Sequence, residues 1–322
     1  MKRINLFAAL MLSVTGWVAT SEVHAQSTGR VVLGFAPGGA VGVMTTLTAD
    51  KLREGLGHPF IHDNRAGGEG QIAIDAVKAA VPDGNTLLMT PIANICIYPH
   101  TYKKLAYDPV KDFIPVAMVG AFNLALVTGP ATPATSVAAF IDWAKANPKQ
   151  AAFGTPGAGN IPHIYGMMFA RAAGISLANV PYKGSPPALN DLMGGHIPAA
   201  VSTLGDFLAQ DKAGRVRILA HSGRERSGLA PDVPTFTELG YKGLQGGGWY
   251  GLFAPAGTPA ERVERINRIV VQGQQAPDMS TRMRSLALEI QLTSAAEFAA
   301  IVRADYERWG EAIRAAGFAG TQ

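Results

Sequence analysis

Apolar runs and amphipathic stretches alternate along almost the whole chain. Short apolar runs such as Val31–Leu33 and Thr86–Met89 predict buried strands, and helical periodicity follows in stretches such as Val43–Glu54. Strands that are apolar throughout are typical of parallel sheets covered by helices on both faces. A second series of the same kind begins after Thr128. The pattern therefore predicts an α/β protein with two doubly wound lobes.

Two apolar runs, Leu124–Val127 and Trp249–Phe253, lie where the chain would cross between the lobes. If both are crossing strands, the chain begins in one lobe, builds the second and returns. We therefore expect residues 26–123 and 251–322 to form lobe 1, and residues 124–250 to form lobe 2. Two lobes with two connections form a hinge that can close on a ligand.

Two capping boxes open helices near the end of the chain. Thr258 and Glu261 have the spacing of one such box, with proline at the first helical position, and predict a helix to about Gln272. Ser294 and Glu297 repeat the pattern ahead of a longer amphipathic stretch. The C-terminal part of lobe 1 is therefore expected to be helical.

The N-terminus has the three parts of a secretory signal peptide. Lys2 and Arg3 precede a mostly apolar run, Leu6–Ala19, and a small-residue cleavage site ends at Ala25. The apolar run is too short for a membrane span of about 20 residues. We expect cleavage after Ala25, removal of residues 1–25, and a mature periplasmic protein that begins at Gln26.

Composition and charge exclude several functions. The formal net charge is +4, and the basic residues are scattered rather than clustered, which argues against nucleic acid as a partner. Cys96 is the single cysteine, so no internal disulfide forms, and its apolar neighbours predict burial. No motif for a metal or a cofactor occurs, so neither is expected.

The stretch Leu33–Gly42 joins the first strand to the first helix through a Pro-Gly-Gly turn. Such a turn directs backbone N–H groups at whatever lies over the helix N-terminus, which is an anion site without a charged side chain. Taken alone it is equally well explained as a tight turn. Residues Phe153–His163 repeat the arrangement, without the signature of a phosphate-binding loop or a dinucleotide site. The two turns together predict one small anion held between the lobes.

A series of short motifs runs in order through nearly the whole mature chain. They are Phe35–Gly39, Asn64–Gly70, Pro82–Leu88, Thr155–Gly159 with His163, Val180–Gly184, Gly194-Gly195, Pro231–Thr235, Gly248–Leu252 and Ala254–Pro259. In this series the sequence resembles the substrate-binding proteins of tripartite tricarboxylate transporters, the Bug-type periplasmic receptors. Each motif alone is weak, but the ordered series is specific.

The resemblance implies a periplasmic binding protein of type II-like fold that closes on a small carboxylate and delivers it to membrane permease subunits. It implies a receptor rather than an enzyme, with no catalytic residues, and we expect a monomer. In the family, a glycine loop from each lobe holds one carboxylate through backbone groups and water. Carried over, the ligand-binding residues are Phe35, Ala36, Pro37, Gly38, Gly39, Ala40, Thr155, Pro156, Gly157, Ala158, Gly159 and Asn160.

The sequence departs from the family at two positions after the first loop. Gly42 and Thr46 stand where the family usually has an aspartate and often an arginine. Loss of the aspartate removes a partner for an ammonium group and a like charge that a dianion would avoid. We therefore expect an aliphatic or aromatic dicarboxylate, such as terephthalate, rather than an amino acid.

Four further side chains are candidates for the site. His163 lies one helical turn beyond the second loop, although a capping or packing role explains it equally well. Ser202, Thr203 and Asp206 follow a predicted strand end, where open α/β sheets bind ligands.

Two other functions stay open from the sequence. An exported hydrolase would need a nucleophile beside a base, and Ser202 with His163 or His221 is the best pairing available. A periplasmic sensor that signals to a membrane kinase would have the same fold and site as a transport receptor.

Overall fold

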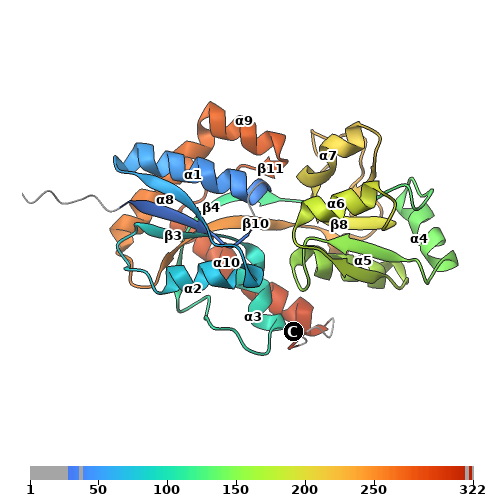
Figure 1. Ribbon diagram of the computed structural model, residues 1–322, viewed down its shortest axis with the longest axis horizontal. Helices are drawn as coiled ribbons and strands as arrows, with labels where there is room; N and C mark the ends of the chain where they lie inside the picture. The colour runs from blue at the N-terminus through green and yellow to red at the C-terminus, as the bar shows by residue number, and fades with distance from the viewer. Residues whose placement is uncertain (1–27, 36–38, 316–318, 321–322) are drawn as a thin grey trace, which may run out of the picture.

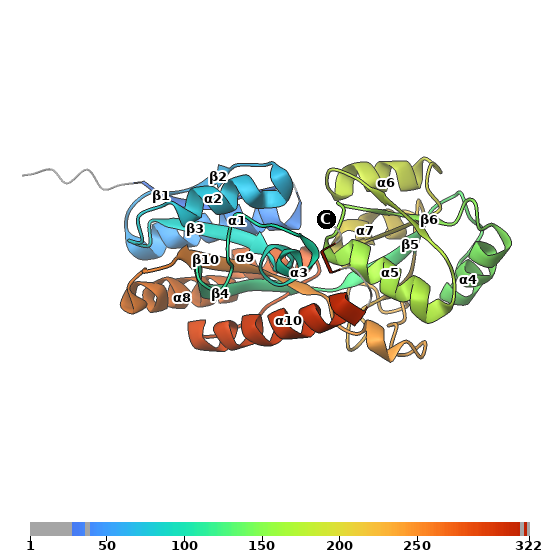
Figure 2. The same cartoon turned by 90° about the horizontal axis from the view of Figure 1, so that it is seen from below.

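The structure, a computed structural model, describes residues 28–35, 39–315 and 319–320. The predicted signal peptide and the loop residues Ala36, Pro37 and Gly38 lie outside the described residues. Two β-sheets lie side by side along the long axis of the molecule, each packed with helices (Figures 1 and 2). The predicted two-lobed α/β fold is confirmed.

The first sheet has six strands in the order β11-β4-β10-β3-β1-β2. Strand β1 runs parallel to β2 and β3, whereas β10 runs antiparallel to both β3 and β4. The sheet is mixed rather than wholly parallel because β10 enters from the second lobe, against the direction of its neighbours. The strands are β1 (Gly29–Leu33), β2 (Phe60–Asn64), β3 (Thr86–Pro91), β4 (Phe113–Phe122), β10 (Gly248–Pro255) and β11 (Leu288–Glu289).

Helical segments cover the first sheet. They are α1 (Ala40–Leu56), η1 (Gly68–Gly70), α2 (Gln71–Lys78), η2 (Ala93–Ile97), α3 (Tyr98–Thr101), α8 (Ala260–Gln275), α9 (Pro277–Ser285) and α10 (Ala295–Ala315). Helix α1 begins three residues before the predicted start and ends at Gly57, whose φ of 75° forms a left-handed C-cap. In the part of the chain that the structure describes, no helix has both the length and the apolar character needed to cross a membrane.

The second sheet has five strands in the order β7-β6-β8-β5-β9. Strand β6 runs parallel to β7 and β8, and β5 runs antiparallel to β8 and β9. Its strands are β5 (Leu124–Thr128), β6 (Ala152–Thr155), β7 (Ala178–Pro181), β8 (Ala199–Thr203) and β9 (Arg217–His221). Its helices are α4 (Val137–Ala146), α5 (Ile161–Ala173), α6 (Ser185–Met193), α7 (Leu204–Lys212) and η3 (Lys242–Leu244).

The chain passes between the sheets twice. Asn123 is the single residue between β4 and β5, and the return ends where β10 begins at Gly248, paired with Phe122. The first sheet thus takes strands from both ends of the chain, and the second sheet takes its strands from the middle. This supports the lobe ranges 26–123 with 251–322 and 124–250, which stay a proposal, although β10 joins the first sheet already at Gly248.

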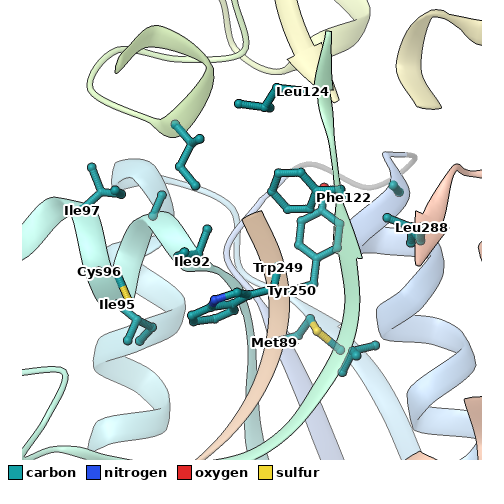
Figure 3. Packing of buried hydrophobic residues seen from close by; sticks show 14 of the residues in the cluster. Met89, Ile92, Ile95, Cys96, Ile97, Phe122, Leu124, Trp249, Tyr250 and Leu288 are labelled. Carbon is teal, nitrogen blue, oxygen red and sulfur yellow. The ribbon is translucent and has the colours of Figure 1, made fainter. Parts of the chain in front are cut away.

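Aromatic side chains fill the first lobe beside these crossings (Figure 3). The ring centroids of Phe122 and Tyr250 lie 4.7 Å apart, and those of Trp249 and Phe298 lie 5.2 Å apart. All four side chains are buried. Trp249 is therefore a packing residue at the crossing, and the predicted burial of Cys96 in the same core is also confirmed.

One of the two predicted capping boxes forms. The Ser294 backbone N–H donates to Glu297 Oε2 at 2.8 Å, and the Glu297 N–H donates to Ser294 Oγ at 3.2 Å. The box at Thr258 is wrong, because the Thr258 hydroxyl donates back to the carbonyl oxygen of Pro255 at 2.8 Å. Pro259 is the N-cap of α8 instead.

A substitution at Gly247 tests whether the close approach of the two crossings stabilises the fold. A Cβ atom at Gly247 would lie 1.7 Å from the carbonyl oxygen of Phe122, whereas one at Gly243 would meet nothing within 4 Å. We expect Gly247→Ala to lower the free energy of unfolding by roughly 2–4 kcal/mol, because backbone must move to admit the methyl group. Gly243→Ala, the matched control, should change it by less than about 1 kcal/mol. Urea denaturation measures both, and equal effects would contradict the packing at Gly247.

Candidate ligand-binding site

The first glycine-rich loop connects β1 to α1 at the end of the first lobe that faces the second lobe (Figure 1). Gly39 is the N-cap of α1, in extended conformation, and the first turn of the helix contains no acidic residue. No N-cap side chain therefore competes for the first N–H groups of α1. Of the six predicted ligand-binding residues here, Phe35, Gly39 and Ala40 are described; Ala36, Pro37 and Gly38 are not.

A second glycine-rich segment, residues 67–70, lies directly beside the first loop. A Cβ atom at Gly34 would lie 2.5 Å from Gly70 Cα, and one at Gly70 would lie 3.3 Å from the Phe35 ring. The φ angles of residues 67 to 70 are 141°, 55°, 54° and 91°. Glu69 therefore has a left-handed backbone conformation, which is uncommon for a residue with a side chain and favours glycine.

The buried side chain of Asn94 holds this segment in place. Its Nδ2 donates to the carbonyl oxygen of Glu69 at 2.8 Å, and its Oδ1 accepts from Thr90 Oγ1 at 3.0 Å. The Asn94 carbonyl oxygen accepts from the Tyr107 hydroxyl at 2.6 Å. Asn94 lies on η2, a π-helical turn, which is a rare element that is frequent at functional sites.

The second loop connects β6 to α5 and is rich in internal hydrogen bonds. Asn160 caps α5, since its Oδ1 accepts from the His163 N–H at 3.0 Å. The Gly159 N–H donates to His163 Nδ1 at 2.9 Å. The Thr155 hydroxyl is buried 2.8 Å from the Gly157 carbonyl oxygen, and the Pro156 carbonyl oxygen accepts from Gly184. His163 therefore shapes the loop, and the Gly159 N–H is already paired.

The loops of the two lobes meet at Glu69 and Gly157. A Cβ atom at Gly157 would lie 3.3 Å from Glu69 Oε2 and 3.7 Å from Oε1. Beside this contact, the side chain of Ile161, the first residue of α5, lies 3.0 Å from the Cβ position of Gly248. The segment that meets the second loop is residues 67–70, which packs beside Gly34 and Phe35, rather than the predicted first loop itself. That the first and second loops hold one anion between them, and the part played by each loop residue, stay predictions.

The candidates Ser202, Thr203 and Asp206 lie at the C-terminal end of β8 and the start of α7. Ser202 Oγ donates to Asp206 Oδ2 at 2.5 Å and lies 3.0 Å from Ser185 Oγ, at the start of α6. Burial, and then the charge of Asp206, raise the pKa of the Tyr250 hydroxyl on β10 of the first lobe. A hydroxyl that donates to a carboxylate is not activated by a histidine base, so the pairing of Ser202 with an imidazole does not form.

Two titratable groups of the loops have shifted pKa values. Partial burial raises the pKa of the Glu69 carboxyl group above its ordinary 4.5, and the hydrogen bond from the Tyr98 hydroxyl at 3.2 Å opposes this only in part. Burial lowers the pKa of His163, which favours the neutral imidazole that accepts from Gly159.

The described residues also contain an open cavity of about 590 Å³, on the second lobe between α4, β9 and residues 232–234. Its lining includes none of the predicted ligand-binding residues. Within the described ranges, no cluster of three or more histidine, cysteine, aspartate or glutamate side chains is arranged to hold a metal ion.

Sequence reasoning missed Glu69, Tyr98, Asn94 and Ser185. Residues Asn64–Gly70 stand out as a glycine loop, but their contact with the second lobe depends on a left-handed run that no periodicity reveals. A signal was present, since Glu69 is the one charged residue within the run Gly67–Gly70. Arg65, which follows β2 at the start of this loop, donates to Asp63 Oδ2 at 2.9 and 3.1 Å.

Two sheets with two connections, and a glycine loop from each lobe at their junction, define a two-lobed periplasmic solute-binding protein. A model of the family described as "Tripartite tricarboxylate transporter family receptor" matches residues 44–318. The chain belongs to this family, whose members are periplasmic receptors rather than enzymes.

Relatives and solved structures agree with this assignment. Protein BugT of Bordetella pertussis is 29% identical over 320 residues, covering 98% of each chain. The R. palustris protein Rpa4515, solved with adipate, has a TM-score of 0.85 at 29% identity and covers 91% of this chain and 98% of its own. MatC from Rhodopseudomonas palustris, solved with bound malate, has a TM-score of 0.82 at 28% identity, covering 89% and 98%.

The raised pKa of Glu69 predicts a pH-dependent effect on stability. Folding favours the protonated carboxyl group, so its contribution is greatest below pH 4.5 and is lost as the pH rises through the higher pKa of the folded state. We expect Glu69→Gln to be more stable than the wild type at pH 7 and equally stable near pH 4. Thermal unfolding across pH measures this.

Glu264→Gln is the matched control for this comparison. Glu264 is an exposed residue of α8, so its substitution should leave stability unchanged at every pH. A constant difference between Glu69→Gln and the wild type from pH 4 to 7 would contradict the raised pKa of Glu69.

Proposed function

We propose that this receptor captures a small carboxylate between its two lobes and delivers it to the membrane permease of a tripartite transporter. The observation that carries the proposal is the meeting of two glycine-rich loops, one from each lobe, at Glu69 and Gly157. Each loop leads into a helix, and helix N-termini attract carboxylates through backbone N–H groups and the helix dipole.

A dicarboxylate is the ligand class that we propose. Two structural relatives were solved with adipate and malate, both of them dicarboxylates. Helix α1 brings no carboxylate to its first turns, since Gly42 is buried and the Thr46 hydroxyl is turned to Gly42 O and His62 Nδ1. The absence of a carboxylate here favours an anionic ligand over one with an ammonium group. The ligand is an aliphatic or aromatic dicarboxylate, such as terephthalate.

Lobe closure explains how capture would be signalled to the permease. A carboxylate that bridges both loops gains all its contacts only when the lobes are together, so binding shifts the population to the closed form. The predicted export, with cleavage after Ala25, would place the receptor in the periplasm, where such a permease collects its substrates.

A thermal-shift panel on residues 26–322 tests the proposal. The compounds are terephthalate, phthalate, adipate, malate, citrate, benzoate and aspartate. A dicarboxylate present at 100 times its dissociation constant should stabilise the folded protein by about 2.7 kcal/mol and raise the melting temperature by roughly 5 °C. A shift with aspartate alone would overturn the dicarboxylate class, and no shift with any carboxylate would overturn the function.

Asn160 and Ser136 form a matched pair for the second loop. Each caps a helix of lobe 2 through its side chain, α5 at the junction and α4 away from it. Alanine at either position should lower the free energy of unfolding by about 1 kcal/mol. Only Asn160→Ala should also weaken ligand binding, several-fold, because the loop loses its order; calorimetric titration measures this. Equal affinities would remove Asn160 from the site.

A further inference from the structure

Glu69 is placed at the junction at a conformational cost. Its φ of 54° lies in the left-handed region, where a side chain is disfavoured, and its three neighbours in the run are glycines. The hydrogen bond from Asn94 Nδ2 to the Glu69 carbonyl oxygen fixes the peptide, and Asn94 is itself fully buried. The backbone conformation therefore fixes the position from which the Glu69 side chain extends toward the second lobe.

Within the part of the chain that the structure describes, the Glu69 carboxyl group has one hydrogen-bond donor and no cation beside it. Tyr98 donates to Oε2 at 3.2 Å. Burial, and then the charge of Glu69, raise the pKa of the Tyr102 hydroxyl. The second lobe faces it with Gly157, beside the amide of Asn160, whose Nδ2 lies 3.1 Å from the Gly157 Cβ position. His163, further along α5, is held neutral by burial.

No ion pair among the described residues includes Glu69. Arg65, the cation nearest to it along the chain, pairs with Asp63 instead. Among the described residues, the Tyr98 hydroxyl is therefore the group that compensates an ionised Glu69, together with solvent.

We propose that Glu69 is a specificity-determining residue: a ligand group that seats against Gly157 must share a hydrogen with the Glu69 carboxyl group, so a bare carboxylate is captured together with one proton. This rests on the proposed function. The proton comes from solvent, binds one oxygen of Glu69 and is donated to the ligand carboxylate. A ligand with a hydroxyl or ammonium group at that point supplies the hydrogen itself.

The physical reason is the repulsion between two like charges brought together where the lobes meet. Two carboxylates that share a site cannot both stay ionised at low cost, and one of them takes up a proton at a pH where either alone would be ionised. Glu69 is already predisposed to protonation by partial burial, and an arriving carboxylate adds to that. Glu69 thereby distinguishes a ligand that carries a hydroxyl group at this point from one that does not.

Calorimetric titration of wild type and Glu69→Gln with adipate and terephthalate tests the proposal. Titrations at pH 6.5 in two buffers of different ionisation enthalpy give the number of protons taken up on binding. The wild type should take up a fraction of a proton, and its affinity should fall by up to about tenfold per pH unit between pH 6 and 7.5. Glu69→Gln should take up none, bind independently of pH, and bind more tightly than the wild type at pH 7.5.

Two further variants separate this role from a structural one. Glu69→Gly, which suits the left-handed backbone, should behave like Glu69→Gln. Glu264→Gln, which removes an exposed carboxylate of the same lobe, should keep the proton uptake of the wild type. The matched pair succinate and malate adds a direct test, since Glu69→Gln should narrow any preference of the wild type for the hydroxyl-bearing malate.

Each outcome decides one of the two proposals. Binding of either probe without proton uptake in the wild type, or weaker binding by Glu69→Gln, overturns the role of Glu69 and leaves the receptor function intact. Binding by Glu69→Gln alone supports the role of Glu69. Absence of binding by the wild type and all three variants, for all four carboxylates, overturns the dicarboxylate function itself and the role of Glu69 with it.

Discussion

The buried amide of Asn94 is the interaction on which the first lobe's half of the site depends. It uses both ends of its side chain, accepting from Thr90 and donating to the Glu69 carbonyl oxygen. A buried amide without partners would be costly. The hydrogen bond from Asn94 to Glu69 therefore holds the segment 67–70 against the π-helical turn. That segment packs in turn against Gly34 and Phe35, so the first loop inherits its position from a side chain that never faces solvent.

Close contacts to backbone carbonyl oxygens also position the chain where the two lobes meet. Gly247 passes against the carbonyl oxygen of Phe122, and Gly205 approaches the Leu286 carbonyl oxygen so closely that a Cβ atom would lie 2.0 Å from it. At these two points the lobes touch through backbone, and glycine is the residue that permits so close an approach.

The sequence predicted what depends on local pattern. The apolar runs identified β1 and β3, and the glycine turns before α1 and α5 were recognisable because glycine, proline and the helical period change together. It could not predict the direction of β10, since a run such as Trp249–Phe253 reads the same in a parallel or an antiparallel sheet. The capping box at Thr258 failed because the competing acceptor, the Pro255 carbonyl oxygen, is set by the end of β10. Glu69 was missed because its position depends on Asn94, 25 residues away, and on the approach of the other lobe.

The proposed recognition by backbone groups would also limit what the loops can discriminate. N–H groups at two helix ends recognise a carboxylate by its charge and oxygen geometry, and they are indifferent to what the carboxylate is attached to. Solved relatives of this fold hold ligands as different as adipate and malate. Selectivity must therefore come from side chains that border the loops, and the structure provides two such groups on opposite lobes. One is the Glu69 carboxyl group with Tyr98; the other is the hydroxyl pair Ser185 and Ser202 backed by Asp206. Both groups include a carboxylate, so among dicarboxylates one that also carries a hydrogen-bond donor is matched to these side chains better than one that does not.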